Sequence, residues 1–198
     1  MDSQIHTNKN QDQQNPSGYE PIWPKDLDLS LIPTSTTSQF ITSFFQVSDN
    51  PDLTEEWLSF FHEEAKLVMG DKVAEGKEEI RTLRKGMWEK VKARKHTVQK
   101  VFPAWFTHPQ PRTSTGAGAM DDDVLEFMVY GTVDYTLRET ETGEAEKEEK
   151  MDWAAHAKLI RRDDAAGQGA GDGEASKTGN TSMLVFNRYR VYLSPSVE

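Results

Sequence analysis

The stretch VLEFMVYGTVDYTL, residues 124–137, decides the fold, because the β-branched and aromatic residues that fill it are typical of a long β-strand. Fully extended, such a strand would span roughly 46 Å at about 3.3 Å per residue, whereas a domain of this size is only about 40 Å across. The strand must therefore curve. Gly131, near its centre, is the natural position for a bulge or a bend.

Three other segments have the same strand-like composition and complete a sheet of four long strands: residues 94–103, 151–161 and 183–193. The stretches between the strands are poor in apolar residues and rich in Gly, Ser or Glu. We expect them to be flexible loops, at residues 107–122, 139–150 and 163–181.

Helices are predicted before this sheet. The first is indicated by four apolar residues that share one helical face behind a cluster of Ser and Thr, namely Phe40, Ile41, Phe44 and Phe45. The stretch SDNPDLTEEWLSFFHEEA then predicts a second helix, capped by Asp49 or Asn50 and ending near Ala65.

The stretch KLVMGDKVAEG predicts two short strands about a turn at Gly70 and Asp71, and Gly76 then opens a third, amphipathic helix. Three helices followed by a curved antiparallel sheet predict an α+β fold in which the sheet wraps around the helices as a cone. Residues 35–194 would form this domain. Residues 1–34 are rich in Gln, Asn, Ser and Pro and predict a disordered tail, although the piece around Trp23 could dock on the domain.

Composition narrows the classes of function. The sequence contains no cysteine, which excludes disulfides and thiolate chemistry, and its net charge of -10 argues against general affinity for nucleic acid. It has no signal-peptide pattern and no apolar run long enough for a membrane span, so we expect a cytoplasmic protein. We also expect no metal and no cofactor, because the sequence has neither a metal-ligand spacing around His62 nor a phosphate-binding glycine loop.

Several strings in this order resemble the SnoaL-like branch of the nuclear transport factor two-like superfamily, particularly its uncharacterised fungal members. They are ITSFFQVSDNPDLTEEWLSFF, MGDKVAEGKEEI with Gly76 and Ile80 opening the third helix, RKHTVQKVF, YGTVDYTL, MDWAAHAKLI and RYRVYL. The resemblance implies a cone with a pocket between helices and sheet, commonly dimeric through the outer face of the sheet. It does not imply one chemistry, since the superfamily contains isomerases, dehydratases, cyclases and non-catalytic binding proteins.

His96 is the first candidate for a catalytic group. It begins a strand that follows the third helix, its imidazole titrates near neutral pH, and its position resembles that of a pocket histidine in a dehydratase of the superfamily. Alternation places it on one face with Val98 and Phe102. That is equally the pattern of a hydrogen-bonded core histidine.

Asp134 and Tyr130 are the other catalytic candidates, and they share the more polar face of the long strand. If this face points inward, they would serve as acid or base and as hydrogen-bond donor to a carbonyl. If it points outward, they belong to a dimer interface or to the solvent. A bulge at Gly131 would change the parity, so the sequence leaves both readings open.

Aromatic residues supply candidate ligand contacts. Trp57, Trp88 and Trp153 fall on apolar faces and are first of all core residues that could also line a pocket. His156 alternates with apolar residues, which favours the surface or an interface.

The sequence thus predicts a small-molecule-binding protein that forms a homodimer and binds neither nucleic acid nor membranes. Whether it is an enzyme stays open. One reading is a lyase or isomerase that performs acid/base chemistry on a polyketide-like or terpenoid metabolite. The alternative is a non-catalytic interaction or ligand-carrier module built on the same cone.

Overall fold

The computed structural model describes residues 17–25, 34–104, 125–139, 145–162 and 183–195. The elements follow in the order α1 (Thr34–Ser48), α2 (Thr54–Ser59), β1 (Phe61–Met69), β2 (Lys72–Glu75), α3 (Gly76–Met87), β3 (Val91–Ala104), β4 (Leu125–Leu137), β5 (Lys147–Arg162) and β6 (Met183–Pro195). Among these residues no helix is both long enough and apolar enough to cross a membrane.

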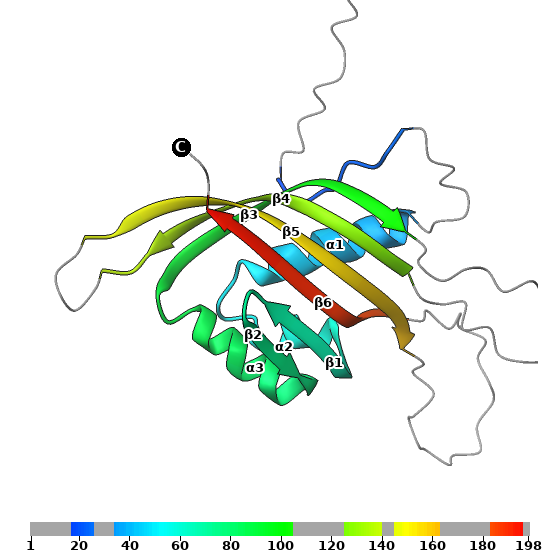
Figure 1. Cartoon of the computed structure of the whole chain (residues 1–198), viewed down its shortest axis with the longest axis horizontal. Coiled ribbons are helices and arrows are strands. Elements are labelled where there is room, and N and C mark those ends of the chain that lie inside the picture. Colours follow the sequence, from blue (N-terminus) through cyan, green and yellow to red (C-terminus); the bar gives the residue numbers. More distant parts are fainter. Residues whose placement is uncertain (1–16, 26–33, 105–124, 140–144, 163–182, 196–198) are drawn as a thin grey trace, which may run out of the picture.

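The six strands form one sheet in the order β2-β1-β6-β5-β4-β3. Every neighbouring pair is antiparallel except β1 and β6, which run parallel. The long strands β3 to β6 curve over the helices, which all lie on one side of the sheet (Figure 1). The predicted α+β cone is confirmed.

The inner face of the sheet is set by strict alternation along β4. Phe127, Val129, Gly131 and Val133 are buried, whereas the residues that alternate with them are only partly buried. These inner side chains pack against aromatic residues of α1, where Phe44 contacts the rings of Trp57, Phe186 and others at 4.8–6.1 Å. Burial of such rings is the main source of stability in a domain of this kind.

Gly131 is indeed where the sheet deforms, but the extra residue lies on the neighbouring strand. The register of β3 against β4 shifts between Val98 and Lys100, opposite Gly131. A Cβ at Gly131 would lie 1.9 Å from the carbonyl oxygen of Thr97, so only glycine permits this approach of the two backbones. The shift turns Phe102 to the outer face, where it is 46% exposed, and not to the face of His96 as simple alternation predicts.

The predicted second helix is too long. α2 ends at Ser59, and Phe61–Met69 forms β1. The aromatic spacing in this stretch suits a helix, yet Phe61, Ala65 and Leu67 also alternate, and all three are buried in the core as strand residues. Pairing of β1 with β6 satisfies the backbone there, so tertiary contacts override the local helical pattern.

Two other boundaries differ from the sequence prediction. Residues 147–150, expected to be part of a flexible loop, pair with β4 as the start of β5. Residues 17–25, expected to be part of a disordered tail, pack on the domain, with Ile22 bridged to Lys100 of β3. The predicted loops 107–122 and 163–181 lie wholly outside the described residues.

Candidate functional site

A cavity lies between α1, α2 and the inner face of the sheet. Its inner part has a volume of about 40 Å³, enough for water-sized groups. An outer cavity of about 310 Å³ adjoins it, because five residues line both: Met69, Met87, Arg94, Tyr135 and Leu193. The two cavities share this wall, and His96 lines only the inner one.

His96 and Asp49 form a hydrogen-bonded pair at the inner cavity. Nδ1 of His96 meets Oδ1 of Asp49, and the backbone N–H of His96 donates to Oδ2 at 2.7 Å. The side chains are only 13% and 7% exposed, respectively. An ionised carboxylate can only accept, so the Nδ1–H donates to Asp49, and Nε2 of the neutral ring carries the lone pair.

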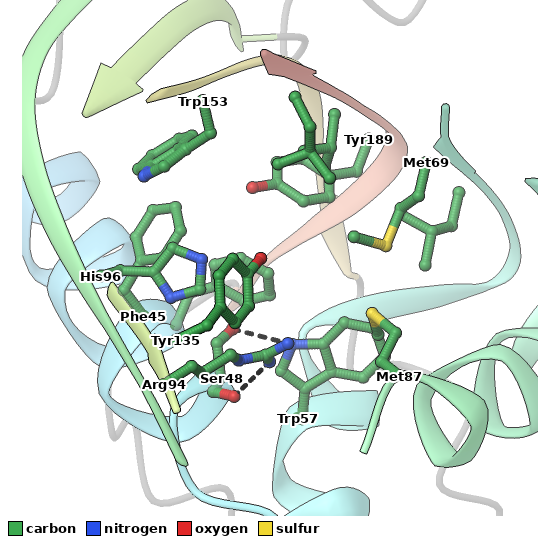
Figure 2. A pocket seen from close by; sticks show the side chains of 14 residues that line it. Phe45, Ser48, Trp57, Met69, Met87, Arg94, His96, Tyr135, Trp153 and Tyr189 are labelled. Carbon is green, nitrogen blue, oxygen red and sulfur yellow. Dashed lines mark hydrogen bonds between the residues drawn. The ribbon is translucent and has the colours of Figure 1, made fainter. Parts of the chain in front are cut away.

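The other side of the His96 ring faces the cavity, where Figure 2 shows it turned toward Tyr135 and Tyr189. Phe45 and Trp153 enclose it, with ring centroids 5.1 and 5.6 Å away. Burial lowers the pKa of His96, and Arg94 and Lys95 lower it further, although Asp49 opposes the shift. The imidazole is therefore neutral at pH 7 and able to accept a proton.

Asp49 is held by more than His96. Nε of Arg94 lies 3.5 Å from its Oδ1, and the hydroxyl of Tyr19 donates to its Oδ2 at 3.1 Å. Asp49 follows α1 directly and, contrary to the expected cap, does not cap α2, whose N-cap is Leu53 without a side-chain bond. The carboxylate belongs to the site.

Two buried guanidinium groups lie at the C-terminal end of α1, beneath the cavity. Arg84 donates to the carbonyl oxygens of Val47 and Asn50 at 3.2 and 2.7 Å, where the helix dipole is negative. Burial lowers the pKa of Arg84 to about 9, which leaves it charged at pH 7. Arg94 donates to the carbonyl oxygen of Ser48 and stacks 4.5 Å above the ring of Trp88.

Two phenols complete the cavity wall. Tyr135 of β4 and Tyr189 of β6 both line the inner part, and neither hydroxyl bonds to another described residue. Figure 2 shows both hydroxyls turned toward the space in front of His96. Burial raises the pKa of each phenol, so both are protonated donors at neutral pH.

The structure separates the predicted catalytic residues. Asp134 and Tyr130 lie on the outer face of β4, across the sheet from His96. Asp134 is 52% exposed and 3.6 Å from Lys150. Tyr130 stacks on Phe102 with centroids 6.0 Å apart. The polar face of this strand points outward, which removes both residues from the site.

The tryptophans divide in the same way. Trp57 and Trp153 line the inner cavity, whereas Trp88 does not and instead packs against Arg94. His156 points to the outer face, where its Nε2 lies 2.5 Å from Oε1 of Glu126. The sequence analysis named His96 as a candidate but did not name its partner Asp49, because no pattern links a residue after a helix to one 47 positions later.

No family model matches the chain, and no curated protein shows significant similarity to it. Solved structures do resemble it. A protein assigned as a scytalone dehydratase from Novosphingobium aromaticivorans aligns with TM-score 0.58 and 8% identity, over 84% of this chain and 87% of that one. The hexachlorocyclohexane dehydrochlorinase LinA-type3 from Novosphingobium barchaimii gives 0.55 and 11%, over 82% and 88%.

ActVI-ORFA from Streptomyces coelicolor aligns with TM-score 0.51 and 13% identity, over 80% of this chain and 95% of that one. Identities this low establish the fold and not the chemistry. The chain therefore shares the α+β cone fold of these solved structures.

Proposed function

We propose that this protein binds a small apolar molecule in the cone and catalyses proton transfer on it, with His96 as general base. The observation that carries the proposal is the His96–Asp49 pair at the inner end of a cavity. Apolar and aromatic side chains line that cavity and suit a ring compound such as a polyketide-like or terpenoid metabolite.

The chemistry follows from the hydrogen bonds. Nε2 of His96 takes a proton from an acidic carbon of the substrate, and Asp49 stabilises the imidazolium that forms. The hydroxyls of Tyr135 and Tyr189 donate to the oxygen on which negative charge develops. If the proton returns to another carbon, the result is isomerisation. If a leaving group departs from the adjacent carbon, it is elimination, the reaction of a lyase.

The two residues of the pair have different roles: Asp49 orients the imidazole ring, and His96 transfers the proton. Asp49 is fixed by two contacts from His96 and one from Arg94, so it holds the ring in one tautomer. Positioned proton transfer of this kind contributes about 10²- to 10⁴-fold to a rate. That is enough for a carbon already activated by a carbonyl.

The test uses 5-nitrobenzisoxazole, a chromogenic probe for a buried base. Removal of its C–H proton breaks the ring N–O bond and releases a coloured phenolate, so no other reagent is needed. We expect turnover by the full chain that falls by about 10²-fold or more in His96→Gln. The rate should rise with pH through the lowered pKa of His96.

The matched control is His156→Gln, because His156 also pairs with a carboxylate but lies on the outer face. It should keep full activity. Equal rates for wild type and His96→Gln would contradict the general-base role. Binding without turnover, seen as a change in tryptophan fluorescence with 2-tetralone, would favour the ligand-carrier alternative.

We also propose a homodimer through the outer face of the sheet. The support is the exposure of Phe102 and Tyr192, at 46% and 47%, on a face where Tyr130 stacks on Phe102. Exposed aromatic side chains on one face of a sheet are typical of interfaces. Light scattering at micromolar concentration should give twice the chain mass, and Tyr192→Glu should give a monomer. A wild-type monomer would contradict the proposal.

A further inference from the structure

Residues 17–25, here called the strap, cover the free edge of the sheet. β3 is an edge strand, and an open edge leaves its backbone groups unpaired. The strap pairs with them. The N–H of Val98 donates to the oxygen of Gly18 at 2.6 Å, and the N–H of Ile22 donates to the oxygen of Gln99 at 2.8 Å.

The strap is also fixed to α1, so it bridges the seam between helix and sheet. Nε1 of Trp23 donates to Oγ of Ser38 at 2.8 Å, and Oγ1 of Thr42 donates to the backbone oxygen of Tyr19 at 3.4 Å. Figure 1 shows the strap beside β3 and α1. Asp49, which follows α1, contacts His96 of β3 across the same boundary between helix and sheet.

Tyr19 reaches the site from the strap. Its hydroxyl donates to Oδ2 of Asp49, and Nζ of Lys95 lies 3.3 Å from its ring centroid. Burial, followed by the charge of Asp49, raises the pKa of this phenol, so it stays a donor. We infer that the strap is part of the functional site and that Tyr19 is a positioning residue for the Asp49–His96 pair.

The physical role follows from how the carboxylate is shared. Tyr19 bonds Oδ2, which leaves Oδ1 on the ring of His96 and limits rotation of the carboxylate. It also draws charge from Asp49, because each donor to a carboxylate lowers its basicity. Removal of the hydroxyl should therefore leave a more basic partner for His96 and raise the pKa of the ring.

We expect the other groups that act on His96 to stay in place when Tyr19 is changed. Arg94 and Lys95 act from β3 itself, and Tyr135 and Tyr189 face it from β4 and β6. Tyr19→Phe keeps the ring over Lys95 and removes only the hydroxyl. The inference rests on the pair of the proposed function but needs no turnover.

The experiment is a pH titration of the histidine ring nitrogens by ¹⁵N NMR on the full chain. Trp23→Phe is the control, since it also removes one hydrogen bond of the strap but does not touch Asp49. We expect Tyr19→Phe to move the His96 midpoint upward and shift its Nδ1 resonance. Trp23→Phe should leave both at the wild-type values.

Removal of residues 1–25 is the second variant, and it should move the same resonances in a chain that retains α1 and the sheet. Identical His96 resonances and midpoints in wild type, Tyr19→Phe and the shortened chain would overturn the inference. If His96 responds as expected but 5-nitrobenzisoxazole is not turned over, the positioning role stands and the proposed catalysis fails. If turnover depends on His96 but the His96 resonances are unchanged in Tyr19→Phe, the proposed catalysis stands and the positioning role of Tyr19 fails.

Discussion

Two histidines on opposite faces of one sheet each pair with a carboxylate, yet only one lies at a cavity. His96 on the inner face is enclosed by aromatic rings and bonds Asp49 from outside its strand. His156 on the outer face bonds Glu126, which projects from the neighbouring strand β4. Neither cavity described above is lined by His156.

The difference shows that a histidine-carboxylate pair does not by itself make a site. The inner pair combines burial, a ring edge open to a cavity, and nearby donors from Tyr135 and Tyr189. The outer pair is also partly buried, with side chains 23% and 16% exposed, but neither residue lines either of the two cavities. Which residues reach the inner face depends on alternation and on the register shift opposite Gly131.

The largest effect is expected from Gly131→Ala. The added Cβ would meet the backbone oxygen of Thr97 at 1.9 Å, so β3 and β4 would have to separate at the point that sets the two faces. We expect destabilisation of more than about 4 kcal/mol, measured by urea unfolding.

Gly86→Ala is the matched control. Its Cβ would meet nothing within 4 Å, and Gly86 lies inside α3. Alanine in a helix should stabilise the protein by about 0.5–1 kcal/mol. Equal stability of the two variants would show that Gly131 does not fix the register.

Asp49→Asn should have the next largest effect. It leaves the buried guanidinium of Arg94 without its carboxylate and turns an amide N–H₂ toward existing donors. We expect a loss of about 3 kcal/mol. Glu126→Gln, on the outer face, should cost only about 1 kcal/mol. Similar losses in thermal melts would remove the energetic contrast between the two faces.

The sequence predicts the fold better than the site, for reasons that these residues show. Alternation along β4 and the helical face of Phe44 and Phe45 are local patterns, and burial follows from them. The Asp49–His96 pair is a contact between distant segments. The orientation of Tyr130 and Asp134 depends on which face meets the helices, which no local pattern encodes.

A smaller effect concerns pH. The pKa of His96 is lower in the folded protein than its ordinary value of about 6.5, so below that pH the unfolded chain takes up a proton first. The stability linked to the neutral ring is complete above about pH 6.5 and is lost as the pH falls toward the folded pKa. Wild type should lose more stability between pH 7.5 and 5 than His96→Gln does. Equal losses would contradict a buried neutral ring.

The smallest effects are expected from changes at Asp134 and Tyr130, the two catalytic candidates on the outer face. These changes test whether the outer face contributes to activity. The Asp134–Lys150 pair is 3.6 Å apart, and its side chains are 52% and 61% exposed, so solvent screens it. Asp134→Asn should therefore change the free energy of unfolding by less than about 0.5 kcal/mol and leave turnover of 5-nitrobenzisoxazole unchanged. Tyr130→Phe keeps the ring that stacks on Phe102 and removes only a hydroxyl on the face opposite His96. This variant should also turn over 5-nitrobenzisoxazole at the wild-type rate. A tenfold loss of activity in either variant would mean that the outer face takes part in the chemistry, and the assignment of the site to the inner face alone would fail.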